Sequence, residues 1–510
     1  MTQVSARIGR PSRIAIDLWA VIHLVGSLGK YLGLAAAFPI AVAIGYGDPF
    51  WPFLAAGAIT SGLGWGLERV AAHPDRRLSV REGFLVVALT WLLAAAFASM
   101  PYLFAGGEQL ASPIDAYFEG MSGFTTTGAT VVTDFDELNE SMLMWRQFTQ
   151  WLGGMGIIVL AIAVLPRLRV GGRQLMESEL PGPEIGALSE RIRSTARRLW
   201  ALYAVLTGVQ ALILASFGWS GIDDAMTPFN AVAHAFTTMP TGGFSPEPRS
   251  IEPFAAASQW VIAIFMIAAG ANFALLYRGL VRRRANAFAR DEEFRLYVAL
   301  IVIAAAFLTA QVWSYGIAGG EEAFRVGLFQ AVTIMTSTGY ATADFATWPI
   351  LSILTLFGLM FIGGCAGSTG GGIKVVRHLL MGKILRREIG QTLSPESVIP
   401  IRLNNAPVDE RTLRAIAAFI LLYVGLWAVG AAVIAVDIAF TGLGVPGLDP
   451  LAISASAIGN IGPALGVTGP MGSYAAVGDV SKVTMIALMW VGRLEIIPVV
   501  VLLTRHYWRL

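Results

Sequence analysis

A short, hydroxyl-rich loop is the part of this sequence whose residue types best suit chemistry. Residues 122–130 read Ser-Gly-Phe-Thr-Thr-Thr-Gly-Ala-Thr and carry no charge, although the chain around them is very apolar. Hydroxyl groups and backbone carbonyls are oxygen ligands, and glycine permits the backbone angles that bring successive carbonyls to one side. The chemistry that this pattern predicts is coordination of a cation.

The same pattern recurs along the chain. Similar stretches occupy residues 237–244 and 336–341, and a looser copy occupies residues 457–463. The key glycines of the four copies are Gly128, Gly242, Gly339 and Gly462, which lie at roughly even spacing. A stretch repeated in this way predicts one structural unit that is built four times.

The composition places these loops in a membrane protein. Of the 510 residues, 55% are hydrophobic and only 14% are charged, and the mean hydropathy is +0.64. Apolar runs of the length that a bilayer requires recur along the whole chain, which leaves little room for a soluble domain. The only cysteine, Cys365, excludes an intrachain disulfide.

Each glycine loop lies between two apolar segments. The predicted spans are residues 14–46 and 50–65, then 83–105 and 142–165, 199–219 and 259–280, 294–315 and 348–364, and 415–439 and 483–503. We therefore expect an all-α polytopic membrane protein, with two N-terminal transmembrane helices and four pseudo-symmetric helix–pore loop–helix repeats around a central pore. The predicted divisions are residues 1–80 for the N-terminal helices and 81–190, 191–290, 291–405 and 406–510 for the repeats.

The positive charges predict the orientation. Most of the 36 lysines and arginines fall in the N-terminus, the alternate loops and the C-terminus, whereas none lies between Arg81 and Arg146. By the positive-inside rule, both termini are cytoplasmic and all four glycine loops enter from the outer side. Residues 1–13 are basic and lack a cleavage site, so we interpret them as a cytoplasmic start and not as a signal peptide.

Each glycine loop follows a segment too short to cross a bilayer. Three of these segments start with a capping residue and a proline, which is a helix-entry signal; the pairs are Ser112-Pro113, Thr227-Pro228 and Asp449-Pro450, while the third copy starts near Gly320. We expect a half-membrane helix followed by an extended return, with carbonyls directed at a central axis and helix C-termini adding partial negative charge. Such a carbonyl ring replaces the hydration shell of a potassium ion. The alternative is that these loops are ordinary turns on the outer surface. It does not explain why the loop occurs four times, or why three copies follow a short segment that begins with a capping residue and a proline.

The motifs resemble those of the TrkH/KtrB/HKT superfamily of potassium transporters, and most closely those of its TrkH branch. They are GFTTTGAT at residues 123–130, STGYATADF at 337–345 and GNIGP at 459–463. The resemblance extends over essentially the whole chain, and the two extra N-terminal spans are typical of TrkH. It implies a bacterial inner (plasma) membrane protein that forms homodimers, with one chain supplying all four quarters of a pore. The ion-binding carbonyls that it implies belong to Thr126, Thr127, Gly128, Pro240, Thr241, Gly242, Ser337, Thr338, Gly339, Asn460, Ile461 and Gly462.

A second unusual stretch, residues 363–374, is rich in glycine and interrupts the second span of the third repeat. It is not a phosphate-binding loop, because Ile373 separates Gly372 from Lys374 and no strand precedes it. A flexible hinge is one interpretation. The resemblance implies an intramembrane gating loop beneath the filter, in which we include Gly370, Gly371, Gly372 and Lys374.

Arg493 lies inside the last predicted span, where an arginine is costly and faces protein or a water cavity. One interpretation is an ion pair with Glu495 or another neighbour. The resemblance implies instead a cationic residue near the permeation path that keeps ions from leaking, and Lys374 would add to the same barrier.

Other features of the sequence limit which cofactors and partners we expect. The chain has no nucleotide-binding fingerprint, and its five histidines have no metal-ligand spacing. We therefore expect no cofactor in this chain, potassium ions as its substrate, membrane lipid around it and no nucleic acid partner. The resemblance implies regulation by a cytosolic nucleotide-binding subunit similar to TrkA.

The function predicted from these patterns is channel-like potassium uptake through a carbonyl-lined filter, gated by the glycine-rich loop and Arg493. The alternative is a symporter that couples potassium to sodium or protons. It requires a buried carboxylate on the path, and Asp437 and Glu495 are the candidates. A membrane enzyme would need a catalytic constellation, which we do not find in the sequence.

Overall fold

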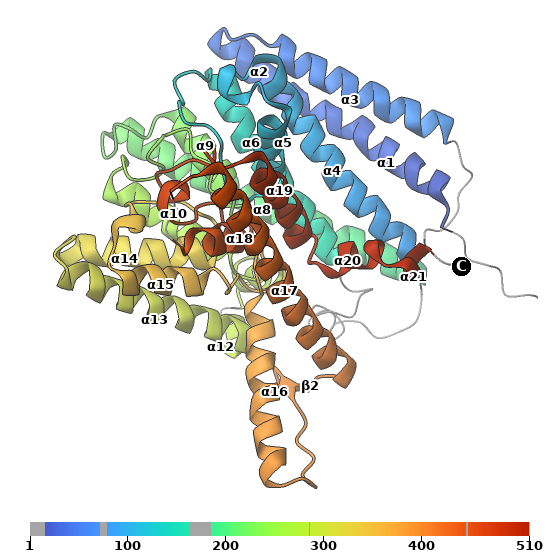
Figure 1. Cartoon of the computed structure of the whole chain (residues 1–510), viewed down its shortest axis with the longest axis vertical. Helices are drawn as coiled ribbons and strands as arrows, with labels where there is room; N and C mark the ends of the chain where they lie inside the picture. The colour runs from blue at the N-terminus through green and yellow to red at the C-terminus, as the bar shows by residue number, and fades with distance from the viewer. Residues whose placement is uncertain (1–15, 72–78, 164–184, 285, 445–446, 509–510) are drawn as a thin grey trace, which may run out of the picture.

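The computed structural model describes residues 16–71, 79–163, 185–284, 286–444 and 447–508. Within these ranges the chain is a bundle of helices (Figure 1). The single exception to the predicted all-α fold is a two-stranded antiparallel hairpin, in which β1 (Arg402–Leu403) pairs with β2 (Ala406–Pro407). From the body of the molecule, the helix that precedes this hairpin extends downward in Figure 1, where it is labelled α16 (Val375–Leu393).

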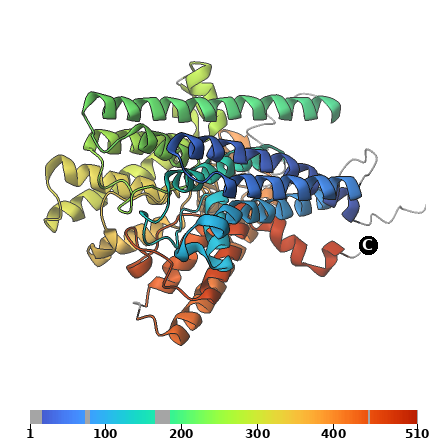
Figure 2. The same cartoon turned by 90° about the horizontal axis from the view of Figure 1, so that it is seen from above.

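The N-terminal helices pack through small residues. The elements are α1 (Leu18–Leu32), η1 (Gly33–Ala36), α2 (Ala37–Tyr46) and α3 (Trp51–Val70). A Cβ atom built on Gly33 or Gly64 would lie within 3.0 Å of the backbone of the facing helix. Small residues permit such close approach in a bilayer, where apolar burial no longer drives association. An ion pair of 2.6 Å between Lys30 and Glu68 joins α1 to α3 (Figure 2, blue).

The remaining helices fall into four groups in chain order, each of which contains one glycine loop, and the predicted boundary between residues 190 and 191 falls inside the first helix of the second group. The first unit contains α4 (Val80–Ala105), η2 (Glu108–Leu110), α5 (Pro113–Phe124) and α6 (Glu140–Ala163). The second contains α8 (Ile185–Ser220), α9 (Pro228–Thr238), α10 (Ala256–Ala269), α11 (Phe273–Leu276), η4 (Tyr277–Val281) and α12 (Asn286–Arg290). The third contains α13 (Glu292–Ser314), α14 (Gly320–Met335), η5 (Phe345–Thr347), α15 (Ile350–Leu359), α16 and the hairpin. The fourth contains α17 (Glu410–Thr441), α18 (Asp449–Gly459), η6 (Gly466–Thr468), α19 (Asp479–Arg493), α20 (Ile497–Leu503) and α21 (Arg505–Trp508).

Five described helices are long and apolar enough to cross a membrane, and the number is seven if each of two bent pairs is one span. The bends are 105° between residues 256–269 and 273–281, and 118° between residues 479–493 and 497–503. The sequence-based expectation of ten spans also includes α3, α6 and the segment around α15, which do not meet this criterion within the described residues. The count of ten stays a prediction.

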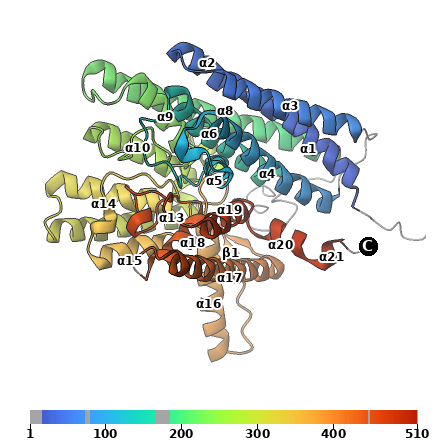
Figure 3. The same ribbon diagram turned by 45° about the horizontal axis from the view of Figure 1, so that its top comes forward.

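Four short helices, α5, α9, α14 and α18, lead into the glycine loops. Figure 3 shows α5, α9 and α18 gathered between the longer helices. Of the three predicted capping residues, only Thr227 accepts a hydrogen bond with its side chain, from the backbone N–H of Asn230 at 3.2 Å. Ser112 holds the N-cap position without such a bond. Asp449 is not a cap as predicted, because α18 starts at Asp449 itself and Leu448 precedes it as the N-cap.

Candidate functional site: a ring of four glycine loops

The four glycine loops have the same backbone conformation. Each contains a left-handed residue two positions before a left-handed glycine. The first residues are Thr126, Thr241, Ser337 and Asn460, with φ of 51°, 56°, 58° and 52°, and the glycines are Gly128, Gly243, Gly339 and Gly462, with φ of 82°, 80°, 83° and 106°. Left-handed φ is uncommon for residues other than glycine, so its recurrence at one position shows that the four loops share one local backbone geometry.

Backbone hydrogen bonds give the same register. The residue between each left-handed pair donates its N–H to the carbonyl five residues earlier, at the end of the short helix. These bonds are Thr127 to Ser122 at 2.9 Å, Gly242 to Thr237 at 2.8 Å, Thr338 to Thr333 at 2.8 Å and Ile461 to Ser456 at 3.0 Å. Each loop is therefore anchored to its own helix in one way.

This register corrects the expected alignment of the second loop. The equivalent of Thr126-Thr127-Gly128 is Thr241-Gly242-Gly243, one residue later than the predicted Pro240-Thr241-Gly242. Two adjacent glycines cannot be distinguished by residue type, and only Gly243 has the left-handed conformation. The other three predicted triplets keep their register.

The four loops close into a ring. A Cβ atom built on each left-handed glycine would lie within 3.0 Å of a carbonyl oxygen of the next loop: Gly128 meets Gly242, Gly243 meets Thr338, Gly339 meets Ile461, and Gly462 meets Thr127. The loops therefore follow one another in chain order around an axis, and the last contacts the first. Only glycine fits at the four positions, because a side chain would collide with backbone atoms that cannot move independently.

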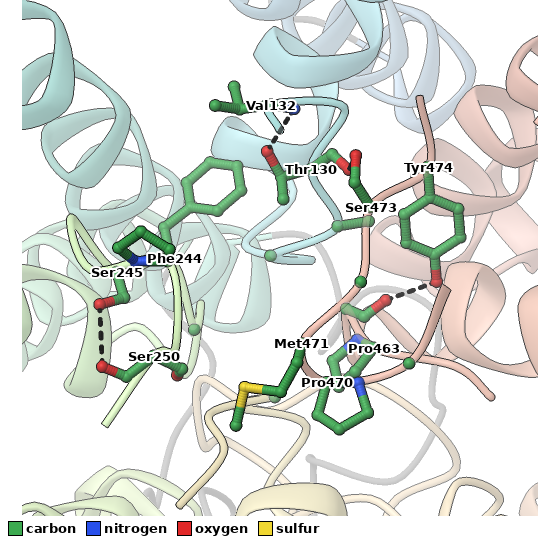
Figure 4. A pocket seen from close by; sticks show the side chains of 18 of the residues that line it. Thr130, Val132, Phe244, Ser245, Ser250, Pro463, Pro470, Met471, Ser473 and Tyr474 are labelled. Atoms are coloured by element: carbon green, nitrogen blue, oxygen red, sulfur yellow. Dashed lines mark hydrogen bonds between the residues drawn. The ribbon is translucent and has the colours of Figure 1, made fainter. Parts of the chain in front are cut away.

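A vestibule of about 350 Å³ lies over this ring (Figure 4). All four left-handed glycines line it, together with residues of the segments that follow them. Tyr474 donates its hydroxyl to the carbonyl oxygen of Gly462 at 2.7 Å, and Ser245 donates to the carbonyl oxygen of Ser250 at 3.3 Å. The vestibule therefore opens directly onto the ring.

A buried ion pair between α5 and α6 contacts the segments that follow the first two loops. The sequence analysis did not predict it. Arg146 of α6 and Glu119 of α5 approach to 2.8 Å, and both side chains are at most 1% exposed. Glu119 accepts from the N–H of Val131 at 3.1 Å, while Arg146 donates to the carbonyl oxygen of Ser245 at 3.4 Å and lies over the ring of Phe244. The signal that would have indicated Arg146 is its charge within a predicted span.

Gln150, one turn further along α6, also escaped the sequence interpretation. Its amide nitrogen donates to the carbonyl oxygen of Gly242 at 2.7 Å, and its amide oxygen accepts from the N–H of Phe244 at 3.1 Å. One side chain thus satisfies backbone groups on both sides of Gly243. A buried amide that is bonded through both ends specifies one loop conformation, since breaking it would leave buried groups unpaired.

Two further side chains connect loops across the ring. Asn460 donates to the hydroxyl of Thr127 at 3.0 Å, and the hydroxyls of Thr237 and Tyr340 are hydrogen bonded. Thr126 Oγ1 and Asn460 Oδ1 are buried and have no partner among the described residues. Both atoms are oxygen ligands left available near the ring, where water or a cation would satisfy them.

The glycine-rich stretch, residues 363–374, lies against the ring. It connects α15 to α16, and Gly371 donates its N–H to the hydroxyl of Ser337 at 2.6 Å. A Cβ atom on Gly371 would lie within 3.0 Å of the carbonyl oxygen of Gly459, at the start of the fourth loop. Thr369 reaches the second loop, where its hydroxyl donates to the carbonyl oxygen of Met239 at 3.0 Å. One segment therefore contacts three of the four loops.

Two buried basic side chains donate to backbone carbonyls of this stretch, Arg493 from α19 and Lys374 from the C-terminal end of the stretch itself. Arg493 donates to the carbonyl oxygen of Thr369 at 2.9 Å, and Lys374 donates to that of Gly370. The Nε and Nη2 atoms of Arg493 are buried and have no hydrogen-bond partner among the described residues. The proposed pair between Arg493 and Glu495 does not form, because Glu495 is paired with Arg377.

Glu293 accepts hydrogen bonds from both ends of the glycine-rich stretch, and the sequence analysis did not predict this role. One of its carboxylate oxygens accepts from the N–H of Ala366 at 2.6 Å and from the N–H of Val376, in the first turn of α16, at 3.1 Å. Its side chain is buried. The sequence contains Asp-Glu-Glu at residues 291–293, which we would have interpreted only as a helix start.

The two carboxylates weighed for ion coupling have fixed protein partners. Asp437 accepts from the N–H and the hydroxyl of Ser481 at 3.1 and 2.6 Å, which joins α17 to α19. Glu495 pairs with Arg377, whose guanidinium lies 3.8 Å from the ring centroid of Phe419. Among the described residues, no group of three or more His, Cys, Asp and Glu side chains is arranged to hold a metal ion.

Short helices that converge on a closed ring of backbone loops, inside a bundle of membrane-crossing helices, define a pore-loop transport protein. Comparison with known proteins agrees with this class. The family model named TrkH, described as a cation transport protein, matches residues 52–508. The chain belongs to the TrkH family, and it is a transporter and not an enzyme.

The similarity to individual relatives covers nearly the whole chain. The Trk system potassium uptake protein TrkH of Salmonella typhimurium is 36% identical over 502 residues, which cover 96% of this chain and 99% of the relative. TrkG of Escherichia coli, also a Trk system potassium uptake protein, is 33% identical over 96% of this chain and 98% of its own. The crystal structure of the potassium transporter TrkH from Vibrio parahaemolyticus superposes with a TM-score of 0.85 at 32% identity, covering 97% of this chain and 100% of that chain.

Proposed function

We propose that this protein takes up potassium ions through the ring of glycine loops, with the carbonyl oxygens of the ring in place of the ion's hydration water. The observation that carries the proposal is the closure of the ring, in which four left-handed glycines bring the loops into contact. Carbonyl rings of this kind select potassium in other proteins. The filter residues are Thr126, Thr127 and Gly128, Thr241, Gly242 and Gly243, Ser337, Thr338 and Gly339, and Asn460, Ile461 and Gly462.

The gate in this proposal is the glycine-rich stretch with its two cations. Gly370, Gly371 and Gly372 obstruct the path beneath the filter, and Arg493 and Lys374 add a positive barrier. The contacts of Gly371 with Ser337 and of Arg493 with Thr369 support this role, because they join the stretch to the filter and hold a charge beside it. Opening then requires that these hydrogen bonds break or that the stretch moves as a unit.

Channel-like conduction is favoured over symport by the state of the carboxylates. The two carboxylates considered for coupling, Asp437 and Glu495, are both occupied by protein donors, so neither is free to bind a coupled proton or sodium ion. Symport with sodium or protons remains the second candidate function, and the experiment below separates the two.

The proposed setting is a bacterial inner membrane, with both termini in the cytoplasm and the vestibule facing outward. The active form is a homodimer, and a cytosolic nucleotide-binding subunit similar to TrkA regulates the gate. The names of the relatives support a multi-component Trk system. Four pseudo-symmetric repeats preceded by two N-terminal transmembrane helices remain the proposed architecture.

The test is rubidium uptake into proteoliposomes that contain the purified protein, with potassium or sodium as competitor. We expect potassium to compete strongly and sodium weakly, with no need for an imposed sodium or proton gradient. The control is Gly45→Ala, since a Cβ atom at Gly45 meets no heavy atom within 4 Å, whereas Gly339→Ala should abolish the discrimination. Equal competition by sodium would refute the carbonyl filter, and a strict requirement for an ion gradient would establish symport instead.

A further inference from the structure

A groove of about 1030 Å³ runs along one side of α13, between α12 and α16. Its lining is apolar, apart from Glu292 and Arg295 near the start of α13. Phe288 of α12 and Leu379 of α16 form its sides, and Val298, Val302 and Ile303 continue it along α13. Val302 lies seven positions after Arg295, so the groove follows this membrane-crossing helix for about 10 Å beyond the arginine.

The charged end of the groove has an excess of positive charge. Arg295 lines the groove and is exposed. Arg290 is also exposed and follows Phe288 and Ala289, which line the groove, while the exposed arginines at residues 282–284 precede α12 in the sequence. In the part of the chain that the structure describes, none of these arginines forms an ion pair with a carboxylate. Glu292 does not neutralise them, because it binds Lys383 and accepts from the N–H of Asn404 at 2.9 Å.

The exposed arginines and the apolar lining of the groove suit opposite ends of one ligand. Arginine binds phosphate through several N–H donors, and unpaired arginines at a membrane surface attract anionic lipid. The apolar part suits an acyl chain, because Val302 and Ile303 are 56% and 67% exposed on a helix that crosses the bilayer. Free inorganic phosphate would use the arginines alone and would leave the apolar length of the groove without a partner.

We propose that this groove binds one anionic phospholipid of the cytoplasmic leaflet, with its phosphate at Arg295 and Arg290 and an acyl chain along Val298, Val302 and Ile303. The proposal rests on the proposed orientation, which places the start of α13 at the cytoplasmic surface. The site lies beside Glu293, the residue that holds both ends of the glycine-rich stretch, so a bound lipid would stabilise the start of α13 from which that contact is made.

The experiment is a lipid titration of the full-length purified protein in detergent, followed by native mass spectrometry. The probes are long-chain phosphatidylglycerol, dihexanoyl phosphatidylglycerol, long-chain phosphatidylcholine and inorganic phosphate. We expect the first bound lipid to be long-chain phosphatidylglycerol. Arg295→Gln and Arg290→Gln should each weaken it about fivefold, since one arginine near a membrane surface contributes about 1 kcal/mol. Arg505→Gln, an exposed arginine on α21, is the control.

A second variant tests the acyl-chain part. Val302→Trp should fill the groove and remove the preference for the long-chain over the dihexanoyl lipid. Its matched control is Val436→Trp on α17, because Val436 is also 56% exposed. The proposal is overturned if phosphatidylcholine or inorganic phosphate binds as tightly as long-chain phosphatidylglycerol, or if both tryptophan variants behave alike. It is also overturned if Val302→Trp leaves lipid binding unchanged and alters the oligomeric mass, since the groove would then be an interface between two copies. None of these readouts depends on ion uptake, so they are independent of the proposed potassium function.

Discussion

Gln150 donates its side-chain amide to the carbonyl oxygen of Gly242 at 2.7 Å, and this bond joins α6 to the second glycine loop. The same side chain accepts from the N–H of Phe244, so it holds the loop on both sides of the left-handed Gly243. The second glycine loop is thus held by a residue that precedes it by about ninety positions in the chain. Its conformation depends on a contact between residues that lie 92 positions apart.

Gln150→Leu should therefore disturb the filter while it preserves side-chain volume. The variant leaves two buried backbone groups unpaired, and we expect a loss of about 2–4 kcal/mol in the free energy of unfolding and weaker discrimination between potassium and sodium. Thermal unfolding in detergent and rubidium uptake with competing ions measure the two effects. The control is Gln210→Leu, because Gln210 is fully buried and its amide has no partner among the described residues. Equal effects of the two variants would contradict the role of Gln150.

The buried pair of Glu119 and Arg146 should be stable only as a pair. Arg146→Met leaves a buried carboxylate without its partner, and we expect a loss of about 3–5 kcal/mol in stability. The double variant Glu119→Gln with Arg146→Met should be less damaging than Arg146→Met alone, since it removes the uncompensated charge. A double-mutant cycle of unfolding temperatures checks this, and additive effects would show that the two residues act separately.

The register of the second loop predicts which of two adjacent glycines is essential. Gly243→Ala should abolish selective uptake, because the residue has a φ of 80° and its Cβ atom would collide with the backbone of Thr338. Gly242→Ala should be milder but not silent, since Gly242 does not have a left-handed φ and its Cβ atom would meet the side chain of Gln150, whose displacement would weaken its hydrogen bonds to the loop. Rubidium uptake by the two variants, with Gly45→Ala as control, distinguishes the registers. A more severe effect at Gly242 would favour the alignment expected from the sequence.

Arg493→Gln should raise ion flux. The change removes a buried positive charge beside the proposed path while it keeps a donor for the carbonyl oxygen of Thr369. We expect faster rubidium uptake at equal protein level, measured without any cytosolic partner. Arg249→Gln is a suitable control, because Arg249 is a largely exposed arginine paired with Glu252. Unchanged flux for Arg493→Gln would count against the charged barrier.

Ser337→Ala should also favour the open gate, for a different reason. The hydroxyl of Ser337 accepts the N–H of Gly371 at 2.6 Å, and its removal weakens the contact between filter and gating stretch. One such bond contributes about 1 kcal/mol, so we expect uptake to rise about fivefold. Thr347→Ala is the control, since its hydroxyl bonds only within η5, to Asp344. Slower uptake in Ser337→Ala would contradict a role for this bond in closure.

The sequence by itself determined the features that depend on neighbouring residues. Apolar runs indicate membrane helices because a bilayer selects for length and hydrophobicity, and proline after a short polar residue indicates the entry of a half-membrane helix. In three of the four triplets that the family resemblance implies, the last residue is the glycine with a left-handed φ, and the role of these triplets as a filter stays a prediction. The glycine-rich stretch and Arg493 were recognised because their residue types conflict with their apolar surroundings.

Only the tertiary structure decided which of these features meet. Thr127 and Asn460 are 333 residues apart and become hydrogen-bonded only when the first and fourth loops close the ring. Glu495 has Arg377 as its partner and not the nearby Arg493, because the break after α19 directs the two side chains differently. Gln150, Glu119 and Glu293 are ordinary polar residues in the sequence, and each acts through backbone groups of distant segments. Residue type and spacing predict local conformation, whereas the partner of a buried polar group depends on how the helices pack.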